Sequence, residues 1–306
     1  MARLFHRKEG HTKVTRTAGE LILTVERRLR RARVFFGHGT DNARDEAAAL
    51  VFHAMKLSHD APPAILKRRA TAAQLARIDA LLGQRIDGRM PLPYLTHEAW
   101  FAGLRFYVDE RVLIPRSPFA ELIEKRFAPW IPAANVRRVL DLGTGSGCIA
   151  LAMAKAFPRA RVDAADIDID ALAVAEINRR RLRLTRRVRL VQSDHFKALS
   201  GESYDIIASN PPYVGRREMR GLPREYGHEP RSALESGALG LDSVRVILEE
   251  AARHLNPRGV LVVEVGNSER ALKRAFPRLP FTWLDFERGG GGVFLLTREQ
   301  LMRAAQ

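Results

Sequence analysis

The stretch Asp141-Leu-Gly-Thr-Gly-Ser-Gly147 lies between an apolar run at 138–142 and a run of small apolar residues at 148–156. The first run predicts a buried strand, and the second predicts a helix that stops before Pro158. Three alternating glycines permit a tight turn and let a ligand lie against the backbone, while the start of the helix offers free N–H groups. This stretch therefore predicts a ligand-binding loop at the edge of a sheet.

Outward from this loop, the chain alternates short apolar runs with helical patterns. Strands are predicted at 138–142, 161–167, 188–192, 204–208 and 260–265, and helices at 148–156, 169–184, 241–255 and 268–276. Such alternation predicts a parallel sheet with helices on both faces. The apolar runs at 281–286 and 293–297 are separated by a glycine-rich turn too short for a helix, which predicts an antiparallel hairpin. The expected fold class is α/β, a Rossmann-like methyltransferase with a mostly parallel seven-stranded sheet ending in an antiparallel hairpin, plus a small N-terminal helical domain.

The sequence from about residue 15 to 87 is predicted to be helical. Thr17 with Glu20 fits a capping box, in which hydroxyl and carboxylate each satisfy a free backbone N–H. Two further helices are expected to start after Asn42 and at Thr71. Residues 88–115, which contain strand-forming stretches, predict a β-hairpin. We therefore expect three parts: a helical substrate-recognition domain at 1–87, a β-hairpin linker at 88–116 and a methyltransferase domain at 117–306.

Composition narrows the class of protein. The 306 residues carry 51 lysines and arginines against 35 aspartates and glutamates, a difference of +16, which favours contact with nucleic acid or with a molecule bound to it. Solvated helix faces explain the same excess equally well. No apolar stretch reaches the roughly 20 residues of a membrane span, and Met1 to Lys13 is polar and basic, unlike a signal peptide. We expect a cytoplasmic protein with no membrane partner. Cys148 is the single cysteine, so no cysteine-based metal site is possible, and no metal is expected.

Acidic residues lie at the carboxyl ends of the first three predicted strands of the sheet. Asp141, two residues before the first glycine, disfavours a pyrophosphate and suits the amino and sulfonium cations of S-adenosylmethionine. Asp166 ends the next strand, where an acid accepts the hydroxyls of an adenosine ribose, and Asp194 follows the third, where it can accept the adenine amino group. Each acid alone is an ordinary helix cap, but three in succession predict the cofactor site. The expected cofactor-binding residues are Asp141, Gly143, Thr144, Gly145, Ser146, Gly147, Asp166, Asp194 and Asn210.

Ser209-Asn-Pro-Pro-Tyr213 follows the fourth strand, at the sheet edge where ligands bind in such folds. An amide nitrogen is a poor nucleophile, because its lone pair is delocalised. The side-chain oxygen of Asn210 and the backbone carbonyl of Pro211 can each accept one N–H, which favours a pyramidal nitrogen. Pro212 stiffens the loop, and Tyr213 can stack on the flat amide. We therefore predict Asn210, Pro211, Pro212 and Tyr213 as the catalytic residues of an amide or amine N-methyltransferase.

These residues resemble the glutamine-N5 methyltransferases, a family that carries Asn-Pro-Pro-Tyr and an N-terminal helical domain, and the resemblance runs over nearly the whole chain. One branch modifies the Gly-Gly-Gln tip of peptide-chain release factors, and the other modifies the third protein of the large ribosomal subunit. Segments similar to the ribosomal-protein branch include Gly37-His-Gly-Thr-Asp-Asn42, Pro115-Arg-Ser-Pro118, His228-Glu-Pro230 and Glu264-Val-Gly-Asn-Ser268.

The resemblance implies a glutamine side-chain amide as the methyl acceptor and the large-subunit ribosomal protein as the partner, with ribosomal RNA or assembly intermediates as further candidates. It also implies that Arg116 and Glu121 order the cofactor or the loop over it; an interdomain ion pair is the equally weighted alternative. Other readings are the release-factor reaction, a DNA adenine-N6 methyltransferase, since Asn-Pro-Pro-Tyr also serves exocyclic amines, and a non-catalytic RNA or ribosome-assembly factor. No target-recognition domain for duplex DNA is evident.

Overall fold

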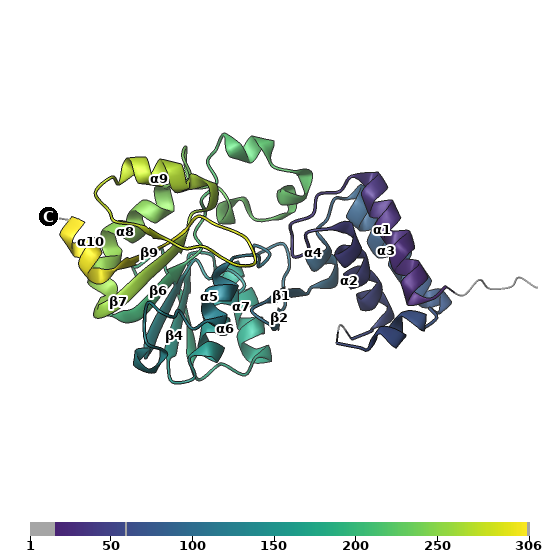
Figure 1. Ribbon diagram of the computed structural model, residues 1–306, viewed down its shortest axis with the longest axis horizontal. Helices are drawn as coiled ribbons and strands as arrows, with labels where there is room; N and C mark the ends of the chain where they lie inside the picture. The colour runs from purple at the N-terminus through teal and green to yellow at the C-terminus, as the bar shows by residue number, and fades with distance from the viewer. Residues whose placement is uncertain (1–15, 59, 305–306) are drawn as a thin grey trace, which may run out of the picture. The chain divides into compact units, whose positions relative to one another are not determined.

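A computed structural model describes residues 16–58 and 60–304, and the basic segment Met1 to Lys13 lies outside the described residues. The chain forms two compact units (Figure 1). The first comprises Met1–Phe36 and Thr40–Leu92, and the second comprises Gly37–Gly39 and Pro93–Gln306. The short connection at Gly37–Gly39 therefore belongs to the second unit, although both of its flanking helices belong to the first.

The first unit is built from three helices, α1 (Ala18–Ala32), α2 (Ala43–Met55) and α3 (Ala72–Asp87), with a 3-10 turn, η1 (Pro63–Lys67). The predicted capping box of Thr17 with Glu20 is present, and the side chain of Asn42 accepts the N–H groups of Arg44 and Asp45. A second capping box pairs Thr71 with Gln74. Local capping signals in the sequence thus placed all three helix starts correctly.

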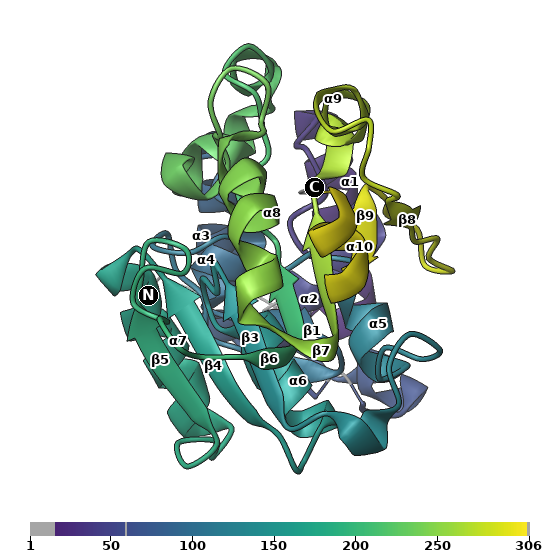
Figure 2. The same cartoon turned by 90° about the vertical axis from the view of Figure 1, so that its left-hand side faces the viewer.

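Helix α4 (Leu92–Thr96) lies at the boundary between the units. In the second unit it is followed by a small antiparallel hairpin, β1 (Ala99–Phe101) and β2 (Leu104–Phe106), as the sequence predicted. Its main sheet has the strand order β5-β4-β3-β6-β7-β9-β8 (Figure 2). The strands are β3 (Arg138–Leu142), β4 (Arg161–Asp166), β5 (Val188–Gln192), β6 (Tyr204–Ser209), β7 (Leu255–Glu264), β8 (Thr282–Trp283) and β9 (Val293–Thr297). The first five in sequence are parallel, and β9 pairs antiparallel with both β7 and β8. The predicted mostly parallel seven-stranded sheet with an antiparallel end is confirmed.

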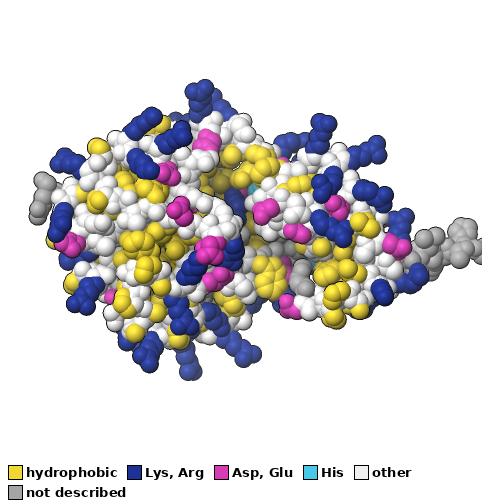
Figure 3. All heavy atoms as spheres, viewed as in Figure 1, with side chains coloured by type: hydrophobic (Ala, Val, Ile, Leu, Met, Phe, Trp, Pro, Cys, Tyr) yellow, Lys and Arg dark blue, Asp and Glu magenta, His cyan; other side chains and the backbone are white. Residues whose placement is uncertain are grey.

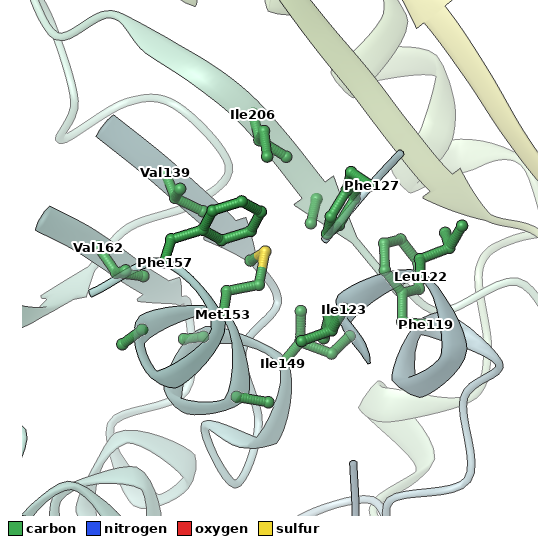
Figure 4. Packing of buried hydrophobic residues seen from close by; sticks show 14 of the residues in the cluster. Phe119, Leu122, Ile123, Phe127, Val139, Ile149, Met153, Phe157, Val162 and Ile206 are labelled. Carbon is green, nitrogen blue, oxygen red and sulfur yellow. The ribbon is translucent and has the colours of Figure 1, made fainter. Parts of the chain in front are cut away.

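Helices cover both faces of this sheet and bury two apolar clusters. On one face lie α5 (Phe119–Glu124), α6 (Cys148–Ala156) and α7 (Ile169–Arg181), and on the other lie α8 (Asp242–His254), α9 (Glu269–Ala275) and α10 (Arg298–Ala304) (Figures 1 and 2). Figure 4 shows the first cluster, in which Phe119 and Phe127 lie near Ile149 and Met153 of α6. The central strands β3, β4, β6 and β7 are buried along most of their length, as expected for parallel strands that helices cover on both faces.

Two features at the carboxyl end of the chain differ from the sequence prediction. The strand expected at 281–286 is only the two-residue β8, because the chain beyond it turns toward α5, where the backbone N–H groups of Glu287 and Arg288 donate to the carboxylate of Glu121 at 3.2 Å. Helix α10 was not predicted. Within the described residues, no helix is long and apolar enough to cross a membrane.

Candidate active site

A cavity of about 480 Å³ opens at the carboxyl ends of β3, β4 and β6. This is where the strand order reverses, since β4 and β5 follow β3 on one side and β6 lies on the other, and ligands bind in parallel sheets at such switch points. The predicted residues that line it are Gly143, Thr144, Gly145, Ser146, Asp166, Asp194, Asn210, Pro211, Pro212 and Arg116. The structure therefore brings the glycine loop and the Asn-Pro-Pro segment to one cavity.

The glycine loop is held against the end of β4. Gly143, Gly145 and Gly147 have φ values of 70°, 54° and 80°, a left-handed conformation that other residues adopt at a cost. The carboxylate of Asp166 accepts the N–H of Gly145 at 2.8 Å and that of Asp168 at 3.0 Å, so each of its oxygens retains a lone pair for a ligand hydroxyl. Burial raises the pKa of Asp166. This loop and its carboxylate suit a nucleoside ribose.

Asp141 lies behind the loop and not in the cavity wall. Its side chain is fully buried, and one oxygen accepts the Thr144 hydroxyl at 2.6 Å and the N–H of Ala150 at 3.0 Å. The other oxygen is buried without a hydrogen bond in the described part of the protein. Burial raises the pKa of Asp141 to about 7. Asp141 thus braces the loop against α6, and Gly147, the N-cap residue of that helix, also lies outside the cavity lining.

Asp194 lines the cavity with its carboxylate already engaged. One oxygen lies 2.7 Å from Nδ1 of His195 and the other 2.5 Å from Nζ of Lys197, and hydrogen bonds from Lys197 and then His195 lower the pKa of Asp194. The side chain is 38% exposed, so further lone pairs remain accessible. His195 also contacts the hydroxyl of Ser243 on α8 at 2.7 Å. A negatively charged acceptor therefore stands at the end of the cavity beyond β5.

The Asn-Pro-Pro segment leaves an amide acceptor buried at the cavity. The hydroxyl of Ser209 donates to the carbonyl of Leu142 at 2.8 Å, which ties the end of β6 to the end of β3. The side-chain oxygen of Asn210 is buried, and no donor in the described structure bonds to it. A buried acceptor without a donor costs free energy unless a ligand supplies one. Asn210 is therefore ready to accept an N–H from a bound molecule.

Tyr213 is not among the residues that line the cavity. Its hydroxyl donates to Glu264 at 3.0 Å, and its carbonyl accepts the hydroxyl of Ser268 at 2.8 Å. Its ring packs on Gly266, where an added Cβ would come within 2.6 Å of the ring. Tyr213 therefore supports the loop through contacts at the end of β7, and the stacking contact that the sequence suggested stays a prediction.

Glu264, which sequence reasoning had not singled out as a site residue, lies at the end of β7. It is buried and accepts hydrogen bonds from the Ser117 hydroxyl at 2.5 Å and from Tyr213, and burial raises its pKa. A glutamate that ends a continuous apolar strand is the signal that could have identified it. Through Ser117 and Tyr213 this one carboxyl joins the cavity wall at 111–117 to the loop after β6.

Arg116 lines the cavity and is bound by Glu229, a second residue that the sequence reasoning missed. The guanidinium donates two hydrogen bonds to the Glu229 carboxylate, at 2.6 and 2.8 Å. Nε2 of His38, in the Gly37–Gly39 connection, lies 3.4 Å from the same carboxylate. Burial alone would raise the pKa of Glu229, but hydrogen bonds from His38 and Arg116 outweigh it and lower the pKa to about 2. Glu121 lies elsewhere, bonded to Lys125 and to the backbone at 287–288.

Taken together, the donor set fits S-adenosylmethionine. The glycine turn lets part of a ligand lie close to the backbone. Asp166 can accept hydroxyl groups, and Asp194 offers a negative charge. Among the described residues, no three His, Cys, Asp or Glu side chains gather as a metal site requires. Cys148 also lines the cavity, and burial raises the pKa of its thiol to about 12, so that it stays protonated at neutral pH.

Comparison with known proteins agrees with this geometry. Residues 125–239 match the family model described as the methyltransferase small domain. The chain is 48% identical over 287 residues to a ribosomal protein uL3 glutamine methyltransferase of Neisseria meningitidis serogroup B, covering 94% of each chain. It is 47% identical over 283 residues to the protein of the same name from Xanthomonas campestris, covering 92% of each.

One solved structure supports the fold. The hMettl16 catalytic domain, determined in complex with the MAT2A 3′UTR hairpin 6, has a TM-score of 0.50 and 17% identity, covering 76% of this chain and 84% of its own. The expected Rossmann-like methyltransferase fold, the ribosomal-protein branch and S-adenosylmethionine as methyl donor are thus confirmed. The chain belongs to the family of ribosomal protein uL3 glutamine methyltransferases and is an S-adenosylmethionine-dependent enzyme.

Proposed function

We propose that this protein methylates the side-chain amide nitrogen (N5) of a glutamine in ribosomal protein uL3, the third protein of the large subunit. The observation that carries the proposal is the buried side-chain oxygen of Asn210, which lacks a donor and shares a cavity with the glycine loop. The names of the relatives from Neisseria and Xanthomonas support uL3 as the protein acceptor.

The residues of this chain would act by orienting the amide. Asn210 accepts one N–H of the glutamine side chain, and the carbonyl of Pro211 accepts the other, so the nitrogen lone pair is freed for attack. When bound, S-adenosylmethionine supplies an electrophilic methyl group on a sulfonium. Held by Asn210 and Pro211, the amide nitrogen would receive that methyl group, and the proton that the methylated amide then loses would pass to water. The rate enhancement would come from holding the amide nitrogen and the methyl group in position, in a site shielded from water.

The cofactor residues are proposed by position. Gly143, Thr144, Gly145 and Ser146 would lie against the methionine and ribose parts, Asp166 would accept the ribose hydroxyls and Asp194 the adenine amino group. Asp141 and Gly147 would act from behind the loop, and Arg116 would hold the facing wall. Pro212 and Tyr213 would fix the Asn210 backbone. Glu121 would order the glycine-rich segment after β8.

Roles are also proposed for the larger parts of the chain, together with the place of the reaction and a further partner. The helical part at 1–87 would recognise uL3, and the hairpin region at 88–116 would link it to the methyltransferase part at 117–306. A ribosomal-protein substrate supports a cytoplasmic location for the reaction. Ribosomal RNA or an assembling particle is the further proposed partner, consistent with the net charge of +16.

The test uses purified uL3, a release factor and duplex DNA as parallel acceptors with isotopically labelled S-adenosylmethionine. We expect label in uL3 alone, on one glutamine by mass spectrometry. Asn210→Ala should lower kcat by at least 100-fold while the affinity for S-adenosylmethionine stays within threefold. Asn256→Ala, which removes an amide bonded to Asp205 away from the cavity, is the matched control and should keep kcat.

Label in the release factor or in DNA, with none in uL3, would refute the substrate assignment. An Asn210→Ala protein with full turnover would refute the proposed role of the amide acceptor.

A further inference from the structure

Seven arginines lie at or just before the starts of three neighbouring strands, β3, β4 and β5. They are Arg137, Arg138, Arg159, Arg161, Arg183, Arg186 and Arg187, and we call them the basic rim. Parallel strands start at one edge of a sheet and end at the other, so the basic rim occupies the edge opposite the cavity. Figure 3 shows Lys and Arg side chains along the lower margin of the methyltransferase unit.

Sheet register brings these arginines together from distant parts of the sequence. Arg138 is the direct partner of Arg161 in the ladder, and the N–H of Val162 donates to the carbonyl of Arg187 at 2.9 Å. Neighbouring strands lie about 4.8 Å apart, so the basic rim spans roughly 10 Å across the three strands. The sequence alone shows separate basic runs, and only the fold makes them one surface.

Three arginines of the basic rim already have partners within the protein. Arg138 pairs with Asp163 and Glu202 at 3.0 and 2.5 Å. Arg137 and Arg187 donate to backbone carbonyls, those of Ala134 at 2.6 Å and Ala154 at 2.5 Å.

Four guanidinium groups remain available to a partner. Arg159, Arg161, Arg183 and Arg186 are exposed, and within the described part of the chain none of them forms an ion pair with an acidic side chain. A surface hollow of about 510 Å³ adjoins two of them and is lined by Arg180, Arg183, Leu184, Thr185, Arg186 and Arg187. Uncompensated cations grouped around a hollow repel one another, and a polyanion would relieve that repulsion.

We propose that the basic rim binds the phosphate backbone of RNA. Guanidinium groups match phosphate oxygens in a two-pronged geometry, and a row of cations suits a chain of evenly charged phosphates better than single carboxylates. A protein interface would need an apolar centre, whereas no large apolar side chain is exposed at 137–138, 159–161 or 183–187. The inference rests on the proposed function in one respect: the RNA is that to which the substrate uL3 is bound.

The position of the basic rim has a consequence for catalysis. Because it lies at the edge opposite the cavity, RNA held there leaves the entrance near Asn210 open to a glutamine side chain. The basic rim would therefore raise the affinity for RNA-bound uL3 and leave the methyl-transfer step on free uL3 unchanged.

The experiment compares two triple variants that remove equal charge. Arg161→Ala/Arg183→Ala/Arg186→Ala removes the exposed part of the basic rim, and Arg270→Ala/Arg274→Ala/Arg278→Ala removes three exposed arginines near α9. Binding of a fluorescein-labelled RNA stem-loop to the full chain is measured by anisotropy from 50 to 300 mM salt. We expect the rim variant to bind at least tenfold more weakly, with a salt slope lower by about 2 to 3, near one for each lost phosphate contact. The α9 variant should stay within twofold of the unmodified protein.

Equal loss of RNA binding in both variants would overturn the proposal, because net charge alone would then explain it. Unchanged RNA binding in the rim variant would also overturn the proposal. Displacement of the RNA by poly-glutamate of equal charge concentration would overturn it as well, because it would indicate an acidic protein partner. Methylation of RNA-free uL3 is measured in parallel and should be unaffected by either variant. If the unmodified protein binds RNA through the basic rim but methylates no uL3, the proposed function fails while the basic rim stands.

Discussion

Arg116 and Glu229 are joined by two hydrogen bonds of 2.6 and 2.8 Å, and the carboxylate is buried beneath the guanidinium. The same carboxylate accepts the backbone N–H of Ile114 at 3.0 Å. The segment at 111–117 forms one wall of the cavity, and residues from Pro230 to Gly237 contribute to another. This pair therefore fastens two walls of the active site to each other.

Breaking the pair should destabilise the protein. Glu229→Gln removes the charge but keeps the shape, leaves Arg116 uncompensated, and should lower the free energy of unfolding by about 3 kcal/mol, measured by urea denaturation at pH 7. The lowered pKa of Glu229, about 2, implies that its stabilising contribution is present above the ordinary carboxyl pKa and is lost as pH falls from about 4.5 toward 2. Glu229→Gln should therefore flatten the acid side of the stability profile. Glu299→Gln, at an exposed pair with Arg303, should change neither quantity, and an equal effect of both variants would contradict the assignment.

Tyr213 should act through its hydrogen bond to Glu264. Tyr213→Phe removes the hydroxyl, lets the loop that carries Asn210 shift, and should lower kcat about tenfold while KM for S-adenosylmethionine changes little. Tyr204→Phe is the matched control, because that hydroxyl also donates to a buried carboxylate, that of Asp163 at 2.8 Å, at the edge opposite the cavity. Both variants should lose roughly 1–2 kcal/mol of stability. A fall in kcat shared by both would show that stability, and not loop position, is responsible.

Asp166→Asn should weaken the binding of S-adenosylmethionine. Both carboxylate oxygens accept a backbone N–H, so an amide NH₂ group in place of one oxygen must face the N–H of either Gly145 or Asp168. Calorimetric titration should give a dissociation constant raised at least tenfold. Asp168→Asn preserves the helix cap, since asparagine caps as well as aspartate, and should bind within threefold of the unmodified protein. Unimpaired binding by Asp166→Asn would disprove the ribose role.

Asp141 should make stability depend on pH near neutrality. Its pKa is raised to about 7, so the folded protein prefers the protonated form, and the stability relative to Asp141→Asn should fall as pH rises from about 4 to 7 and level off above that. Because each pH unit in this range contributes roughly 1.4 kcal/mol, the total loss of folding stability amounts to a few kcal/mol. Thermal unfolding of both proteins between pH 4 and 8.5 measures it. A constant difference across that range would mean that Asp141 titrates normally.

The sequence predicted those parts of the fold that depend on local signals. The strand at 138–142 and the helix at 148–156 have the predicted bounds, because glycines separate them and Pro158 follows the helix. The edge strand was overestimated, since its length depends on Glu121, which lies more than 160 residues away in the sequence and draws the chain aside.

The candidate site divides in the same way. Gly143, Gly145 and Asn210 could be assigned from the motifs that contain them. Glu229 and Glu264 could not be assigned in this way. Glu229 binds Arg116, which is 113 residues away in the sequence, and Glu264 binds Ser117, which is 147 residues away. Only the packed fold brings these residues together. The direction in which Tyr213 points likewise depends on the buried carboxylate at the end of β7.

The tripeptide Gly37–Gly39 has a practical consequence for anyone who wishes to divide or recombine this protein. The imidazole of His38 in this tripeptide lies 3.4 Å from the Glu229 carboxylate, which also binds Arg116. The residues on either side of the tripeptide nevertheless belong to the helical part. A shortened chain beginning at Pro93 would discard a piece of the catalytic half, and a chimaera with helices borrowed from a relative must carry a histidine at the same place. The border between the halves is crossed three times along the polypeptide, so no single scission separates them cleanly.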